Sequence, residues 1–261
     1  MNNIFAFIGP CKTGTTSLYE YLKERPDVCV LGGKDFFDYK NKNGQKKICQ
    51  IAKSKQISTI FFDHDALFSE SSMLALSELN CTPIILVRNP YDQAVSRILH
   101  DLRVGLYDLQ RVVNCNHLDE IDERIYDRGD YLKWHMKFPE IMQKKAVYLD
   151  FNFFESNLMV KKLEELMNLD HQHNNQLIKK SNQAKIGKFP KFNYFIRSTL
   201  KPLFYFFGLD LYWSKFKLSK LAQIFYSNET VDETRKIIEG KVDRSHTNKM
   251  FDDFIKSGLF N

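Results

Sequence analysis

Up to about residue 150, the chain alternates short apolar runs with longer segments whose apolar residues recur every three or four positions. The short runs lie near residues 3–8, 27–31, 58–62, 84–87 and 146–150. Continuous apolar runs of this length are typical of strands that are covered on both faces. Helical spacing is clearest after Pro90, at Val95, Ile98, Leu99 and Leu102. The pattern therefore predicts an α/β fold in which a parallel sheet is sandwiched between helices.

The pattern changes from about Ser181, and a run rich in aromatic and basic residues follows between Phe192 and Lys217. This run favours a helical cap that packs on the sheet. The alternative is a surface that docks on a membrane, because helices with aromatic and basic faces lie in the lipid interface. We predict one domain over residues 1–261, with an α/β core in 1–180 and a mostly helical carboxyl-terminal extension in 181–261.

Composition narrows the classes of partner. The 38 basic and 32 acidic residues give a formal net charge of +6, which suits an anionic ligand and is too mild to indicate nucleic-acid binding. Five cysteines are scattered without metal-ligand spacing, which favours a reducing compartment. The apolar start is too short for a secretion signal, and no apolar run reaches the roughly 20 residues of a membrane span. We therefore expect a cytoplasmic protein.

A hydroxyl-rich loop joins the first apolar run to a helix. It reads Gly9-Pro10-Cys11-Lys12-Thr13-Gly14-Thr15-Thr16-Ser17. Backbone N–H groups at a helix start have no partner inside the helix, and the helix dipole adds positive charge, so such a junction binds phosphate. Gly9 and Gly14 have the spacing of the nucleotide-triphosphatase loop G-x-x-x-x-G-K-[ST], but Thr15 replaces its lysine and the loop's lysine is Lys12. This displacement argues against an ATPase.

The rearranged loop resembles the 5′-phosphosulfate loop of sulfotransferases, α/β enzymes with a P-loop-type fold. These enzymes transfer a sulfuryl group from 3′-phosphoadenosine-5′-phosphosulfate (PAPS) to an acceptor. The resemblance implies that Lys12 contacts the phosphosulfate and its bridging oxygen. It also implies backbone and hydroxyl hydrogen bonds from Thr13, Gly14, Thr15, Thr16 and Ser17. A fixed cation with preorganised donors stabilises the charge that develops on the leaving phosphate.

A second motif follows the strand expected at 84–87 and reads Arg88-Asn89-Pro90, with Ser96 further on. Pro90 suits the first turn of a helix, and Asp92 complements the positive end of that helix. Arg88 therefore stands at the carboxyl end of a strand, where open α/β sheets bind ligands. The motif resembles R-N-P-x-x-x-x-x-S of sulfotransferases, which implies that Arg88 and Ser96 bind the 3′-phosphate of PAPS.

A third region supports the resemblance over residues 128–151. Its G-x-Y, tryptophan, F-P and strand segments look like those of carbohydrate-type sulfotransferases, with Asp150 where family members often carry glutamate. We expect its aromatic residues Tyr131, Trp134 and Phe138 to lie in the core, and we use the region as evidence for the fold.

Two residues are candidates for the base that deprotonates the acceptor. Asp35 takes the place of the glutamate in the K-E-x-x-F-F segment of glycan sulfotransferases, although the spacing to Phe36 and Phe37 is shorter. His64 follows another expected strand, before Arg88, where small-molecule sulfotransferases carry a catalytic histidine. Neutral imidazole is a common base near neutral pH. Asp35 could instead pair with a lysine, and His64 could instead end a capped loop.

Further expectations follow from the family. Lys185 and Lys188 resemble residues of a late loop that closes over the adenine and the 3′-phosphate. The acceptor is expected to be a glycan or glycolipid. If the aromatic and basic carboxyl-terminal run docks on a membrane, the alternative to a helical cap, the membrane contact would be peripheral. Glycan sulfotransferases of the animal Golgi carry a membrane anchor, so a chain without one suggests a bacterial enzyme. Lysine and backbone dipoles supply the positive charge, so no metal is expected.

Two alternatives remain open at this point. A P-loop nucleotide kinase would need a lysine at position 15 and would use ATP with magnesium. A non-catalytic nucleotide-binding partner of a glycan-assembly enzyme would bind the bisphosphate and transfer nothing.

Overall fold

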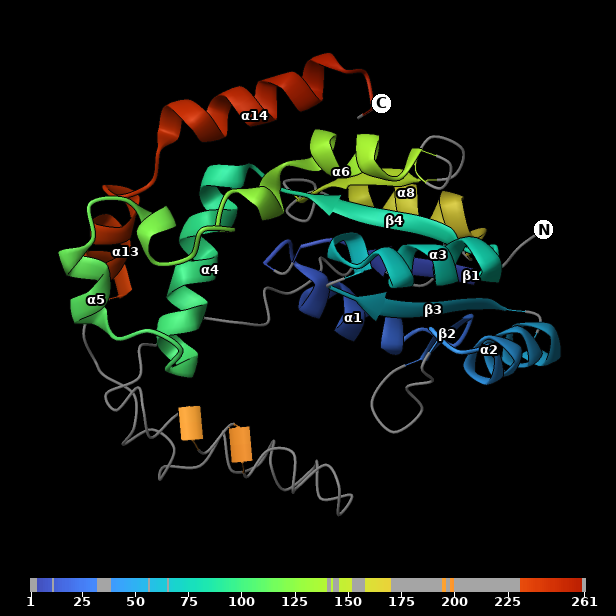
Figure 1. Ribbon diagram of the computed structural model, residues 1–261. Helices are drawn as coiled ribbons and strands as arrows, with labels where there is room; N and C mark the ends of the chain where they lie inside the picture. Colours follow the sequence, from blue (N-terminus) through green and yellow to red (C-terminus); the bar gives the residue numbers. More distant parts are fainter. Residues whose placement is uncertain are drawn as a thin grey trace. The chain divides into compact units, whose positions relative to one another are not determined.

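The computed structural model places a five-stranded sheet at the centre of the α/β part of the chain (Figure 1). The structure describes residues 4–10, 12–31, 39–55, 57–64, 66–139, 142, 146–151, 158–169, 194–195, 198–199 and 231–259. The strands are β1 (Ile4–Ile8), β2 (Val28–Leu31), β3 (Ser58–Asp63), β4 (Thr82–Val87) and β5 (Val147–Asp150). All pair in parallel, in the order β2-β3-β1-β4-β5. The predicted α/β fold is therefore confirmed.

The strand predicted at 84–87 begins two residues earlier. Thr82 and Pro83 pair with Phe5 and Ala6 of β1, whereas the pairing with β5 begins only at Ile84. Proline cannot donate to a ladder, so it is tolerated near the start of a strand.

Helices cover both faces of this sheet (Figure 1). They are α1 (Thr15–Lys23), α2 (Lys42–Lys55), η2 (Ala66–Phe68), α3 (Glu70–Leu79), η4 (Asp127–Gly129), α6 (Tyr131–Lys137), α8 (Leu158–Met167) and α14 (Arg244–Lys256). The chain runs from β1 to the edge strand β2, then reverses and adds β3, β4 and β5 toward the other edge. Because parallel crossovers are right-handed, the reversal places α1 on one face and α2 and α3 on the other.

Side chains of β1 alternate between two cores, as expected for a strand covered on both faces. Ile4, Ala6 and Ile8 enter the larger core, which α2, α3, α6 and α14 close. Phe5 and Phe7 enter the second core, which α1 and α8 close. The predicted core aromatics Tyr131 and Trp134 are buried in the first of these cores, and Phe138 packs against it half-buried.

The contacts of the chain divide it into two compact units. The first comprises residues 1–90, 127–181 and 246–261, and the second comprises 91–126 and 182–245. The second unit contains most of α4 (Pro90–Val104), with α5 (Leu109–Asn114), η3 (Leu118–Glu120) and α13 (Val231–Glu239). The predicted boundary near residue 181 stays a prediction, because residues 170–193 lie outside the described ones.

The core of the second unit confirms the helical spacing seen in the sequence. Val95, Ile98, Leu99 and Leu102 of α4 are all buried. They pack with residues of α5 and with Ile238 of α13. Helix α4 begins at Pro90, as predicted.

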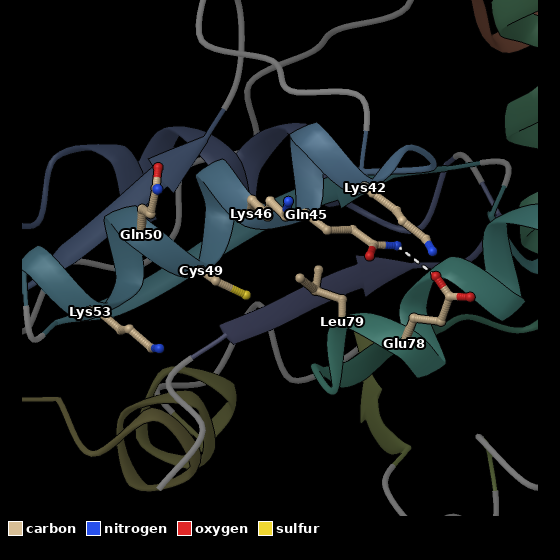
Figure 2. Close-up of a pocket in the computed structure, with 8 residues that line it drawn as sticks. All are labelled: Lys42, Gln45, Lys46, Cys49, Gln50, Lys53, Glu78 and Leu79. Carbon is tan, nitrogen blue, oxygen red and sulfur yellow. Dashed lines mark hydrogen bonds between the residues drawn. The ribbon is translucent and has the colours of Figure 1, made fainter.

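A basic hollow of about 400 Å³ lies between α2 and α3 (Figure 2). It is lined by Lys42, Gln45, Lys46, Cys49, Gln50, Lys53, Glu78 and Leu79. Gln45 Nε2 donates a hydrogen bond to Glu78 Oε2 across the hollow at 3.2 Å. Of the predicted PAPS-binding and base residues that the structure describes, none lines it.

A buried ion-pair network ties α1 to α8 beneath the sheet. The Arg25 guanidinium donates two hydrogen bonds to the Asp27 carboxylate, at 2.9 and 2.7 Å. It also donates to Glu164 Oε1 at 2.7 Å and to the Tyr21 hydroxyl at 3.0 Å. The side chains of Arg25 and Glu164 are 2% and 6% exposed, so this contact is shielded from water.

Replacing Glu164 by alanine should lower the free energy of unfolding by about 1.5–3 kcal/mol, because one charged hydrogen bond to a buried guanidinium is lost. Asp27 remains to neutralise Arg25. Urea unfolding measures the change. The matched control is Glu165→Ala on the same helix, where the carboxylate is exposed and the expected change is within about 0.5 kcal/mol. Equal losses of unfolding free energy in Glu164→Ala and Glu165→Ala would contradict a stabilising role of the contact between Arg25 and Glu164.

A buried histidine makes stability depend on pH. His135 is 3% exposed, and its Nδ1 is hydrogen-bonded to the Tyr148 hydroxyl at 2.7 Å. Burial lowers the pKa of His135, so the unfolded chain binds a proton at a higher pH than the folded chain does. Stability should therefore fall as the pH drops below about 6.5, the ordinary imidazole value.

We expect His135→Asn to flatten this loss. Urea unfolding of wild type and variant between about pH 7 and pH 5 measures the slope of unfolding free energy against pH. His117→Asn, at an exposed histidine of the other unit, provides the control. An unchanged slope in His135→Asn would show that other groups cause the acid sensitivity.

Candidate phosphate-binding site

The loop from Gly9 to Gly14 leaves the carboxyl end of β1 and enters α1. Among its described residues, φ is positive at Gly9, Lys12 and Gly14, with values of 131°, 75° and 87°. Glycine adopts such angles easily. At Gly9 the φ of 131° is one that other residues rarely adopt, so this position favours glycine, although a Cβ would meet Ile85 Cγ2 only at 3.4 Å. For Lys12 the same region is strained, and strain of this kind gathers at binding sites.

Bonds within the loop keep it compact. The Thr13 hydroxyl donates to the Pro10 carbonyl at 2.9 Å, and Thr13 is 1% exposed. This bond gives the Thr13 side chain a structural role in the loop. Thr16 is exposed and Ser17 is half-buried, so these two hydroxyls lie nearer to solvent.

Helix α1 begins directly after the loop, with Gly14 as its N-cap. Glycine carries no side chain that could cap the helix, and the first turn, Thr15-Thr16-Ser17, contains no acidic residue. The first backbone N–H groups of a helix have no partner inside it, and the helix dipole is positive at this end. The junction is therefore suited to an anion such as phosphate.

Arg88 reaches this loop from the neighbouring strand β4. Its Nη1 donates a hydrogen bond to the Lys12 carbonyl oxygen at 2.9 Å. Its guanidinium carbon lies 4.7 Å from the centre of the Phe151 ring, within the range of a cation–π contact. The structure thus brings together Lys12 and Arg88, the central residues of the first two sequence motifs.

Tyr131 holds the backbone of Arg88. The Arg88 N–H donates to the Tyr131 hydroxyl at 3.0 Å, and that hydroxyl donates to the Arg88 carbonyl at 3.2 Å. Tyr131 is 2% exposed. Burial raises the pKa of its hydroxyl above the usual value, so the group keeps the proton that it donates.

The topology explains why these residues meet. The chain leaves β1 toward the β2 edge and leaves β4 toward the β5 edge, although β1 and β4 are neighbours. In open α/β sheets, the crevice outside the carboxyl ends of two such strands is the usual ligand site. Lys12 and Arg88 follow these two strand ends.

The end of β3 lies on the other side of β1. Asp63 is level with Ile8 in the register of the sheet, and it accepts a 2.6 Å hydrogen bond from the Tyr39 hydroxyl. Burial raises the pKa of Tyr39. His64 follows Asp63 and is exposed. The candidate base His64 thus follows the carboxyl end of β3, at the same end of the strands as the phosphate loop after β1. Its catalytic role stays a prediction.

Several predicted site residues cannot be placed beside the loop. Asp35, Lys185 and Lys188 lie outside the described residues. Ser96 lies on α4 in the second unit, whereas Arg88 belongs to the first. The sharing of one phosphate by Arg88 and Ser96 therefore stays a prediction.

Sequence reasoning missed three contacts of this site. Tyr131 was expected only as a core aromatic, whereas its hydroxyl also binds the backbone of Arg88. Phe151 and Tyr39 were assigned no role. Phe151 directly follows a predicted strand, and the carboxyl ends of parallel strands share one edge of a sheet, so its position was the available signal. Tyr39 offered no comparable signal, because it follows the segment 32–38 rather than a strand.

In the described part of the chain, no group of three or more His, Cys, Asp or Glu side chains could hold a metal ion. Among those residues, no helix combines the length and the apolar character that a membrane crossing requires.

No protein-family model matches the chain, and a comparison with curated protein sequences finds no match. Solved structures do resemble it. A sulfotransferase from Alicyclobacillus acidocaldarius matches with a TM-score of 0.52 and 16% identity, over 70% of this chain and 86% of that one. The sulfotransferase domain from the curacin biosynthetic pathway matches with a TM-score of 0.43 and 12% identity, over 65% and 75% of the two chains.

At these identities the likeness concerns the fold alone, and the Alicyclobacillus acidocaldarius enzyme is the one whose fold is shared. The resemblance predicted from the loop and the Arg88 motif is thus confirmed for the fold. The chain has the α/β fold of a bacterial sulfotransferase.

Proposed function

We propose that this chain is a sulfotransferase that moves a sulfuryl group from PAPS to an acceptor hydroxyl and releases 3′,5′-adenosine bisphosphate. The observation that carries the proposal is the hydrogen bond from Arg88 to the Lys12 carbonyl, in a chain with the sulfotransferase fold. It joins the two motifs that resemble the 5′-phosphosulfate loop and the 3′-phosphate arginine of that family.

In this proposal the loop binds the phosphosulfate end of the donor. The ammonium of Lys12 and the backbone N–H groups at the start of α1 are proposed to supply positive charge to the phosphosulfate. Charge develops on the bridging oxygen as its bond to sulfur breaks. Groups that are fixed before the reaction stabilise this charge without reorganising. They supply the positive charge that magnesium gives in phosphoryl transfer, so the proposal includes no metal.

Arg88 recognises the 3′-phosphate, the group that distinguishes PAPS from ordinary nucleotides. A guanidinium presents N–H donors in a planar fork that matches phosphate oxygens. Ser96, Lys185 and Lys188 are proposed as further contacts to the same phosphate.

The transfer is an in-line displacement at sulfur. The acceptor oxygen forms a bond to sulfur while the bond between sulfur and the bridging oxygen breaks, and the electron pair stays on the departing bisphosphate. The acceptor's proton passes to a base, either Asp35 or His64. His64 is supported by its exposed position after β3, and Asp35 is supported by the family resemblance alone.

The acceptor is proposed to be the hydroxyl of a saccharide or glycolipid, from the resemblance of residues 128–151 to carbohydrate-type enzymes. Peripheral membrane contact is proposed for the run between Phe192 and Lys217, nearly all of which lies outside the described residues. A cytoplasmic location is proposed from the scattered cysteines of the sequence, whose pattern favours a reducing compartment.

Ligand preference separates this proposal from a kinase. Wild-type protein should be stabilised more by 3′,5′-adenosine bisphosphate than by ADP or ATP, with or without magnesium. A ligand at 100 times its Kd adds about 2.7 kcal/mol, which raises the Tm of a chain of this size by roughly 5–10 °C. Thermal-shift assays measure the difference. Magnesium-dependent stabilisation by ATP that exceeds the effect of the bisphosphate would favour the kinase.

Replacing Lys12 by alanine should lower sulfuryl transfer roughly 10²–10³-fold, because one preorganised donor to the leaving group is lost. Alanine has the same difficulty with a positive φ, so the change mainly removes the ammonium. A mass-shift assay with PAPS and a panel of saccharides and glycolipids measures turnover. Lys23→Ala, at the exposed end of α1, is the matched control.

Wild-type turnover in Lys12→Ala would refute the role of Lys12. A wild-type protein that binds the bisphosphate yet transfers to no acceptor would favour the non-catalytic nucleotide-binding partner.

A further inference from the structure

Among the described residues, Arg88 contacts Tyr131, Phe151 and Lys12, which come from different parts of the first unit. The Tyr131 hydroxyl binds both its backbone N–H and its carbonyl. The Phe151 ring packs on its guanidinium at 4.7 Å. Its Nη1 donates to the Lys12 carbonyl at 2.9 Å. An arginine that served the 3′-phosphate alone would not need the last contact.

The contact with Lys12 bears on the strained part of the loop. Lys12 has a φ of 75°, a strained region for a residue other than glycine, which persists only where the surrounding structure enforces it. The hydrogen bond from Arg88 fixes the carbonyl of the same residue. Arg88 therefore helps to set the backbone from which the Lys12 ammonium extends toward the phosphosulfate.

Tyr131 acts one step further back. It is fully packed in the core, beside Phe254 of α14 at 5.3 Å between ring centres. A side chain held in this way cannot shift without disturbing the core. Because its hydroxyl binds both polar groups of the Arg88 backbone, Tyr131 fixes the backbone from which the Arg88 side chain extends.

We propose that Arg88 couples the two phosphate subsites of the donor site, and that Tyr131 is a positioning residue that sets this coupling. Arg88 serves the 3′-phosphate and also holds the phosphosulfate loop through the Lys12 carbonyl. Phe151 keeps the guanidinium in the plane that allows both contacts. The inference rests on the proposed function, since it names the donor as a ligand with phosphate at both ends.

If Arg88 couples the two subsites, a change at Arg88 also affects ligands that lack the 3′-phosphate, which a simple contact to the 3′-phosphate would not do. Loss of the Tyr131 hydroxyl should weaken a ligand that has no 3′-phosphate, because the loop at the 5′ end also loses its support. Adenosine 5′-phosphosulfate is such a ligand, since it shares the phosphosulfate end of PAPS and lacks the 3′-phosphate.

Calorimetric titration with adenosine 5′-phosphosulfate and 3′,5′-adenosine bisphosphate tests the inference. Tyr131→Phe should weaken both ligands by roughly 3- to 10-fold, the effect expected for a lost neutral hydrogen bond. Phe151→Leu, which keeps an apolar side chain but removes the ring, should weaken both by roughly 2- to 5-fold. It provides a second test if Tyr131→Phe folds poorly.

Tyr148→Phe is the matched control. It also removes the hydroxyl of a tyrosine whose ring packs on Phe254, but that hydroxyl is hydrogen-bonded to His135. It should change neither affinity by more than about twofold.

The inference is overturned if Tyr131→Phe weakens only the bisphosphate, because Arg88 would then act on the 3′-phosphate alone. It is also overturned if Tyr148→Phe weakens both ligands as much as Tyr131→Phe does, since the effect would then reflect general loss of packing. If wild-type protein fails to prefer the 3′-phosphorylated ligand, the proposed function itself is contradicted. This outcome concerns the wild type, so it can be distinguished from the two outcomes that overturn only the coupling by Arg88.

Discussion

The site depends on one hydrogen bond, which joins residues that are 76 positions apart. Arg88 reaches the Lys12 carbonyl only because β4 lies beside β1 while the chain leaves the two strands in opposite directions. This reversal leaves a crevice outside the carboxyl ends of β1 and β4, which the connections from these two strands do not fill. The two cores that cover the sheet hold the strand ends in register, so the packing of residues far from the loop fixes the geometry of the phosphate site.

Much of the architecture could be predicted because its physical signals are local. A buried parallel strand needs an apolar run on both faces, and all five runs became strands within two residues of the expected bounds. The burial of Val95, Ile98, Leu99 and Leu102 follows from helical periodicity in the same way. The meeting of Lys12 and Arg88 could also be anticipated, since both follow the carboxyl ends of predicted strands.

The remaining contacts could not be predicted, because they depend on tertiary packing. The aromatic character of Tyr131 indicates burial, but nothing in its neighbourhood tells which backbone its hydroxyl will bind. The stacking of Phe151 on Arg88 requires β5 to lie next to β4, a pairing that spacing alone does not specify. The bond between Tyr39 and Asp63 likewise depends on the packing of Tyr39 against the end of β3. Sequence patterns predict which side chains lie at the carboxyl ends of the strands, whereas tertiary packing determines which of these side chains contact one another.

The positive φ of Lys12 also sets a conflict between stability and activity. A glycine at this position would relieve the backbone strain and should make the folded chain more stable. It would also remove the cation from the loop. Selection for thermal stability alone would therefore tend to replace this lysine, whereas the proposed donor site requires its cation.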